Sequence, residues 1–171
     1  MKKIIFIFSI FFLSNQYLQA DIPHFLDFKY ILNESDAGKK AQNQLKDKLN
    51  KGIKGLKDKE KNIQEEEKKI IEQKKIISSE EYKKKVKELR SKVSSLQKER
   101  NTLLETVSKQ RSNARKELLK NLNPIIKEYM KENKIRMVVD KKSLLLADEN
   151  LNITQPIMSL LNKKIKTIKL N

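Results

Sequence analysis

Hydrophobic residues recur with a helical period through the middle of the chain. A first row has a spacing of seven, at Leu49, Leu56, Ile63, Ile70 and Ile77. A second row alternates steps of four and three, through Tyr82, Val86, Leu89, Val93, Leu96, Leu103, Val107 and Ala114. Heptad spacing is typical of helices that pack side by side in a coiled coil. The pattern predicts two long helices, over about residues 36–77 and 79–133.

The two helical rows are separated by a pair of serines. Ser78-x-x-Glu81 fits a capping box, in which the serine and the glutamate satisfy free amides of a new helix. Two long helices joined by so few residues pack antiparallel, so residues 39–133 are expected to form a hairpin arm with its tip near residues 77–80. Two alternatives stay open, namely one uninterrupted helix in a parallel intermolecular coiled coil and a solvated charged linker.

Polar residues interrupt the second row at two seam positions. Arg100 and Gln110 stand where the heptad places hydrophobic side chains. Beyond Val107 the steps pass through Gln110, Ala114, Leu118 and Leu122, a stutter that locally relaxes the supercoil.

Short hydrophobic runs in the two flanks of the arm predict a small β region. The expected strands comprise a first with Ile22, Phe25, Leu26 and Phe28, a second with Ile135, Met137, Val138 and Val139, and a third over Leu144–Ala147. The Lys141–Ser143 segment would be the hairpin between the last two. Thr154 is the expected N-cap of a closing helix, with Ile157, Leu160, Leu161 and Ile165 on one face.

The flanks, residues 21–38 and 134–171, are expected to form one body that oligomerises. A unit this small is marginal without disulfides or a metal, and the chain contains no Cys. Strands from several protomers would complete a sheet or barrel. The fold class is therefore mainly α with a small β region, a long antiparallel hairpin projecting from a β-barrel-like body made by both chain ends. The expected oligomerisation core is Phe25, Leu26, Phe28, Val138, Val139, Leu145 and Leu160.

Residues 1–20 have the pattern of a signal peptide. Lys2 and Lys3 precede the hydrophobic run from Ile4 to Leu13, and a polar stretch leads to Ala20. A run of this length is too short to span a bilayer comfortably. Cleavage is expected after about Ala20, which would leave an exported, soluble chain; an uncleaved N-terminal anchor is the alternative.

The composition argues against an enzyme. With no Cys, one His and three Gly, the chain has no means to build a disulfide, a thiolate or multi-His metal site, or a Gly-rich phosphate loop. His24 is more typical of a structural position than of a catalyst. We therefore expect no catalytic residue, no metal and no cofactor.

The chain is strongly basic, with a net charge of +17 that comes from 39 Lys or Arg against 22 Asp or Glu. Lysine is a hydrated point charge, so its dominance indicates diffuse, salt-sensitive attraction. Acidic membrane surfaces, lipopolysaccharide and acidic unfolded proteins are the candidate partners, whereas nucleic acid is not expected. The candidate anion-binding residues near the tip are Lys68, Lys69, Lys74, Lys75, Lys83, Lys84 and Lys85.

Three segments carry a resemblance to a known family. They are HFLDFKYILNESDAGKKAQNQL (24–45), ISSEEYKKKVKELRSKV (77–93) and IRMVVDKKSLLLADENLNITQPIMSLLNK (135–163). In this order the chain resembles the Skp/OmpH family of periplasmic chaperones. The resemblance implies a homotrimer whose arms surround a basic cavity, acting in the periplasm as an ATP-independent holdase for unfolded outer-membrane proteins. An envelope coiled-coil adaptor and a peripheral protein that binds anionic lipid or lipopolysaccharide are the alternatives.

Overall fold

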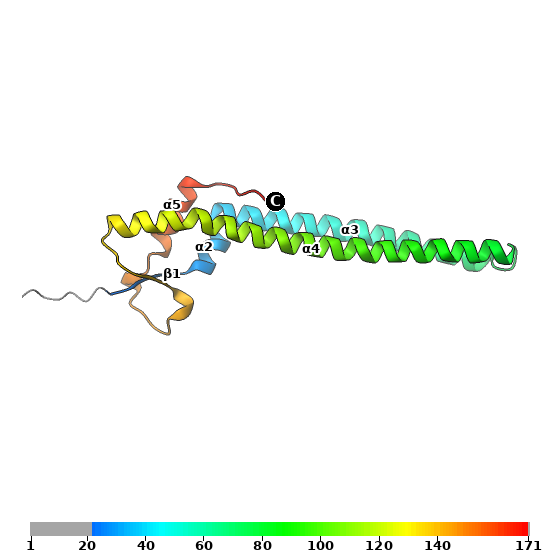
Figure 1. The fold of residues 1–171 in the computed structure, drawn as a ribbon, viewed down its shortest axis with the longest axis horizontal. Coiled ribbons are helices and arrows are strands. Elements are labelled where there is room, and N and C mark those ends of the chain that lie inside the picture. Colours follow the sequence, from blue (N-terminus) through cyan, green and yellow to red (C-terminus); the bar gives the residue numbers. More distant parts are fainter. Residues whose placement is uncertain (1–21, 171) are drawn as a thin grey trace, which may run out of the picture.

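The structure, a computed structural model, describes residues 22–170. The elements follow the order β1 (His24–Leu26), α2 (Phe28–Glu34), α3 (Asp36–Gln73), α4 (Ser79–Glu132), β2 (Val138–Asp140), η2 (Lys141–Ser143), η3 (Glu149–Leu151) and α5 (Thr154–Lys164). Figure 1 shows a long hairpin of α3 and α4, called the arm here, and the remaining elements gathered at one end as the body. The expected signal peptide lies outside the described residues.

The two arm helices begin where the sequence predicts. Ser35 caps α3 by accepting a hydrogen bond from the backbone N–H of Gly38 at 3.2 Å, and Ser78 caps α4 by accepting from that of Glu81 at 3.1 Å. Between them, residues 74–78 form the turn at the tip. Because α3 and α4 fold back on each other, the alternative of one uninterrupted helix is wrong.

The arm is held by a narrow hydrophobic seam with ion pairs beside it. Leu56 and Ile70 are buried from α3, and Val107 from α4. The ion pairs Lys59–Glu99 and Glu66–Lys92 cross between the helices in one constant register. These pairs are exposed and contribute little each, so the seam depends on close packing of its few apolar side chains.

The two strands pair in parallel. His24 lies opposite Val138, Phe25 opposite Val139 and Leu26 opposite Asp140. Parallel neighbours need a long crossover connection, and here the whole arm is that connection. Phe25 also forms an isolated parallel bridge with Asn152, which joins the loop before α5 to the same sheet.

The expected third strand over residues 144–147 is absent. Asp140 instead caps a 3-10 turn at Lys141–Ser143 through the backbone N–H of Lys142, which directs the chain away from the sheet. Leu145 and Leu146 are fully exposed, at 101% and 95%. Within residues 22–170 no strand lies beside them, so the hydrophobic run has no ladder to join.

The first strand is shorter than predicted, and the closing helix begins differently. Asp27 accepts a hydrogen bond from the N–H of Tyr30 at 2.7 Å, so Phe28 starts α2 and is not in the strand. Thr154 is the first residue of α5, and Ile153 precedes it without a side-chain cap. The Thr154 hydroxyl accepts from the N–H of Asp27 at 2.8 Å. Its role is to tie α5 to the end of β1.

The hydrophobic core lies where the arm meets the body. Ile31 of α2, Leu122 of α4, and Ile157 and Leu161 of α5 are fully buried. Leu118 and Ile125, also from α4, belong to the same cluster. The base of α4 therefore supplies core that the two flanks alone would lack.

Candidate functional site

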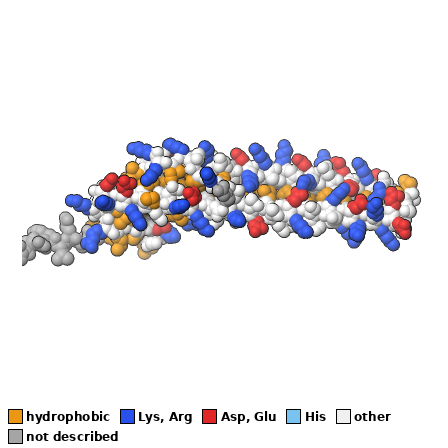
Figure 2. Space-filling view, turned by 45° about the horizontal axis from the view of Figure 1, so that its top comes forward, with side chains coloured by type: hydrophobic (Ala, Val, Ile, Leu, Met, Phe, Trp, Pro, Cys, Tyr) orange, Lys and Arg blue, Asp and Glu red, His pale blue; other side chains and the backbone are white. Residues whose placement is uncertain are grey.

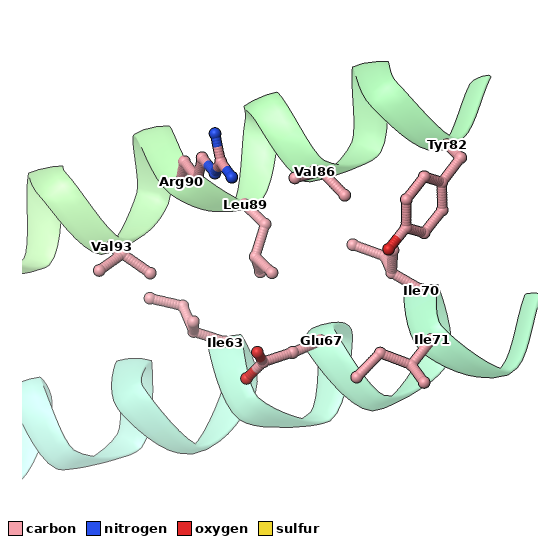
Figure 3. Close-up of a pocket in the computed structure, with 9 residues that line it drawn as sticks. All are labelled: Ile63, Glu67, Ile70, Ile71, Tyr82, Val86, Leu89, Arg90 and Val93. Atoms are coloured by element: carbon pink, nitrogen blue, oxygen red, sulfur yellow. The ribbon is translucent and has the colours of Figure 1, made fainter. Parts of the chain in front are cut away.

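The arm is open near its tip. A cavity of about 410 Å³ lies between the helices there, and Figure 3 shows side chains from both helices pointing into it. Its lining is mostly apolar, with one acidic and one basic residue: Ile63, Glu67, Ile70, Ile71, Tyr82, Val86, Leu89, Arg90 and Val93. The valines and the interrupted seam do not fill the space between the helices. The cavity can therefore accept apolar side chains from a partner.

Hydrophobic side chains are also exposed along the arm. Ile71 and Ile76 near the tip are 60% and 84% exposed, and Leu104 further down is 53% exposed. Single exposed apolar residues are ordinary on proteins. Ile71 also lines the cavity, whereas Ile76 and Leu104 lie outside it, so the arm has a thin, interrupted strip of apolar side chains.

Five of the seven predicted tip lysines are exposed and have no hydrogen bond or ion pair with residues 22–170: Lys68, Lys69, Lys75, Lys83 and Lys84. Lys74 lies over the ring of Tyr82, with 5.6 Å from Nζ to the ring centroid. Lys85 donates to Gln73 at 3.3 Å and lies 3.9 Å from Glu81. The free lysines are available to an anionic partner.

Acidic residues balance most of this charge at the tip. Residues 65–90 contain nine Lys or Arg but also seven Glu, and Figure 2 shows the two charges interleaved toward the far end of the arm. Residues 39–57 instead contain seven Lys and one Asp, and residues 106–120 contain five Lys or Arg and one Glu. A hydrogen bond of 2.9 Å from Lys48 to Gln110 joins these two segments side by side.

We call residues 39–57 and 106–120 together the proximal arm. Most of the excess positive charge lies there, close to the body, and not at the tip that the lysine runs predicted. Runs of adjacent lysines had indicated the tip, whereas the local potential depends on all charges within about 10 Å. The signal that could have found it is the scarcity of Asp and Glu in both segments.

The body places the predicted oligomerisation residues in different surroundings. Phe25 and Leu26 are buried within the chain, Phe28, Val138 and Val139 are half-buried, and Leu160 and Leu145 are exposed. A second cavity of about 440 Å³ lies beside β2, with Leu26, Phe28, Met130 and Val138 in its lining. On the side away from β1, β2 has no strand partner among the described residues. An unpaired, partly apolar strand edge is a pairing site for another chain.

No cluster of His, Cys, Asp and Glu in residues 22–170 is able to bind a metal ion. None of the helices described there is long and apolar enough to cross a membrane. A hydrogen bond from Asn152, assisted by the charge of Lys141, lowers the pKa of Glu149. Glu149 and Asn152 lie in the segment before α5, where their hydrogen bond stabilises the conformation of the chain.

Comparison with known proteins identifies the group to which the chain is related. The family model for OmpH-like outer membrane proteins matches residues 24–161, which is most of the chain. The chain belongs to the OmpH-like family. Its fold is similar to the crystal structure of an OmpH-like protein from Caulobacter crescentus CB15, described as a candidate outer membrane chaperone. The TM-score is 0.81 at 19% identity, covering 86% of this chain and 89% of the other. No curated protein sequence matches significantly.

Proposed function

We propose that this OmpH-like protein is an ATP-independent holdase that binds unfolded outer-membrane proteins in the periplasm. Binding the unfolded client lowers its free concentration, and so slows its aggregation. Many weak contacts along one arm, repeated on further arms, would give useful avidity without a deep pocket. No residue has a catalytic role in this scheme.

The arm is the observation that carries the proposal. It combines an open apolar cavity near the tip, exposed apolar side chains along its length and a basic proximal arm. Apolar contacts suit any unfolded chain, and the lysines add long-range attraction for acidic segments. A rigid adaptor for one folded partner would need a broad complementary face, and such a face is not a feature of this thin strip.

The working form in this proposal is a homotrimer joined through the bodies, with the arms around a cavity. Support comes from the unpaired edge of β2, the neighbouring apolar cavity and the fully exposed Leu145 and Leu146. All of these features belong to the body, and a second and third copy would cover them. Residues 1–20 would direct export and be removed after about Ala20, which N-terminal sequencing of the protein isolated from the periplasm would test.

The holdase proposal is tested by light scattering during refolding of an outer-membrane β-barrel protein. We expect the mature protein to suppress aggregation at near-stoichiometric amounts, without nucleotide. The same preparation is mixed with anionic vesicles and sedimented. Full aggregation of the client, together with strong vesicle binding, would contradict the holdase proposal and indicate a lipid-binding protein instead.

The trimer is tested by measuring the mass of the mature protein in solution. We expect a single species of three chains. Val138→Asp should dissociate it, because a charge would enter the shared apolar contact. Ile76→Asp is the matched control, since Ile76 is 84% exposed at the tip and its replacement should leave the trimer intact. A monomeric unmodified protein would contradict the proposal.

A further inference from the structure

The chain does not end with α5. Residues 165–170, called the tail here, leave the helix in an extended conformation, and Figure 1 shows the tail turning along the arm in the direction of the tip. The family match ends at residue 161, so the tail lies beyond the matched residues. Its path over the arm needs an explanation of its own.

The tail is held by two aliphatic side chains three residues apart, by one ion pair and by its backbone. Ile165 and Ile168 pack against the hydrophobic core, whereas Lys166, Thr167 and Lys169 are exposed. Lys166 pairs with Asp36 at 2.7 Å. The carbonyl of Leu170 accepts a hydrogen bond of 2.8 Å from the side-chain amide of Gln110. These contacts are available to another extended chain that has aliphatic residues at the same spacing.

Gln110 is fixed in the orientation that this contact requires. Its side-chain oxygen accepts from Lys48 at 2.9 Å, and its nitrogen donates to Leu170 at 2.8 Å. Lysine has only donors and a backbone carbonyl is only an acceptor, so the two partners together determine the amide orientation. These two hydrogen bonds explain why a polar residue, Gln110, occupies a seam position. Because the side-chain amide of Gln110 donates to a main-chain carbonyl, the contact does not depend on the side chain of the bound residue.

The charge of the tail does not suit its position. The tail contains Lys166 and Lys169 and no acidic residue. Its end contacts Gln110 of the proximal arm, where residues 39–57 contain seven Lys. Among the residues described, Lys166 has a carboxylate partner in Asp36, and Lys169 has none. Like charges repel, so an extended segment with a neutral or acidic residue in place of Lys169 would bind the same surface more favourably than the tail.

We propose that the surface formed by Asp36, Lys48 and Gln110 is a binding site for an extended polypeptide segment with aliphatic residues three positions apart, and that the tail occupies this site until such a segment displaces it. When the displacing segment is part of an unfolded client, this inference rests on the proposed holdase function. The tail is then a weak internal competitor. It covers apolar surface of the empty protein and is released on loading.

A peptide-binding experiment tests the site directly. The probe is the fluorescently labelled peptide of residues 165–171 carrying Lys169→Glu, added to the mature protein with and without residues 165–171. If the tail occupies the site nine-tenths of the time, its removal should tighten peptide binding about ten-fold. Gln110→Ala in the shortened protein should weaken binding. Gln97→Ala should not, since the side-chain nitrogen of Gln97 donates only to Asn101, at 3.1 Å.

Equal affinity for the full-length and shortened proteins, or no effect of Gln110→Ala, would overturn the proposal and leave the tail as a strap. Circular dichroism checks that the shortened protein is folded, because Ile165 and Ile168 are lost with the tail. A second variant keeps both isoleucines. The chain has no Cys, so Lys169→Cys places a single spin label on the exposed face of the tail.

The label should be immobile in the free protein and mobile after an unfolded β-barrel protein is added. Gln110→Ala should mobilise it without a client, and Gln97→Ala should not. Light scattering on the same samples reports whether the client is held. A held client with an immobile label contradicts displacement while the holdase stands. If no client is held, the peptide measurement still decides whether the site exists.

Discussion

At the residue scale, the three glycines illustrate how much the surroundings determine. A Cβ on Gly38 would lie 2.1 Å from the backbone oxygen of Leu32, at the corner between α2 and α3. A Cβ on Gly52 would meet the methyl groups of Leu103 at 2.5 Å, so the arm helices approach closely at that point. Around Gly55 nothing lies within 4 Å. All three belong to α3, and only the packing distinguishes them.

Replacing these glycines by alanine should have opposite effects on stability. Gly38→Ala should destabilise the protein by about 1–3 kcal/mol, because a backbone carbonyl must move to make room. Gly55→Ala should stabilise it by about 0.5–1 kcal/mol, because glycine costs that much in a helix interior. Urea unfolding followed by circular dichroism measures both. Equal effects of the two changes would mean that the corner at Gly38 is not tightly packed.

At the element scale, α4 has two roles along its length. Its base provides Leu118, Leu122 and Ile125 to the core of the body, and its remaining turns pair with α3 in the arm. One uninterrupted helix thus connects the anchored end to the proposed working end. Stability should be distributed unevenly along it, as expected when buried contacts concentrate at one end.

Truncating leucines at the two ends of α4 tests this distribution. Leu122→Ala should cost about 2–5 kcal/mol, since the side chain is fully buried in the core. Leu104→Ala, at a site 53% exposed on the arm, should change the unfolding free energy by less than about 0.5 kcal/mol. A large loss at Leu104 would show that another chain covers it in the assembled protein.

Shortening the arm should impair client binding and leave the assembly intact. Deleting residues 63–96 and joining the ends by a short turn removes nearly equal lengths of both helices, since Glu66 pairs with Lys92 and Lys59 with Glu99. The core residues all lie outside the deletion. The assembly measured by mass in solution should persist, while suppression of client aggregation falls. Dissociation on shortening would instead assign assembly to the arms.

At the scale of the whole molecule, the distribution of charge matters more than its total. The free lysines at the tip share their surroundings with glutamates, whereas the proximal arm is nearly free of acidic residues. Attraction of an acidic client should therefore be strongest near the body. Screening shortens the range of attraction from about 10 Å at 0.1 M salt to about 3 Å at 1 M salt, so capture should slow as salt increases.

Two matched variants locate the attraction, each removing four charges that have no carboxylate partner among the described residues. One changes Lys46, Lys51, Lys54 and Lys57 of the proximal arm to Gln, and the other changes Lys68, Lys75, Lys83 and Lys84 of the tip. Helix propensity is nearly unchanged by this substitution. Stopped-flow fluorescence at low salt should show slower capture for the proximal variant than for the tip variant, mainly through the association rate. The reverse order would assign recruitment to the tip.

The sequence by itself determined the arm. The heptad rows, the absence of Gly and Pro between Gly55 and Pro124, and the cap at Ser78 predicted both helices and the turn, and the packing of α3 on α4 excluded one uninterrupted helix. A helix satisfies its backbone hydrogen bonds within one segment, so local pattern is strong evidence for it. The free lysines at the tip could likewise be named from the sequence, although the charge balance around them could not.

Only the tertiary structure decided the body and the surfaces built on it. A strand needs a partner, and the hydrophobic run at residues 144–147 has none among the described residues, whereas β1 pairs in parallel with β2 across the whole arm. The core contribution of Leu122 and the contact of Gln110 with the tail join residues far apart in sequence. Pairing, burial and local potential depend on which segments meet in space, and helical periodicity contains no information about that.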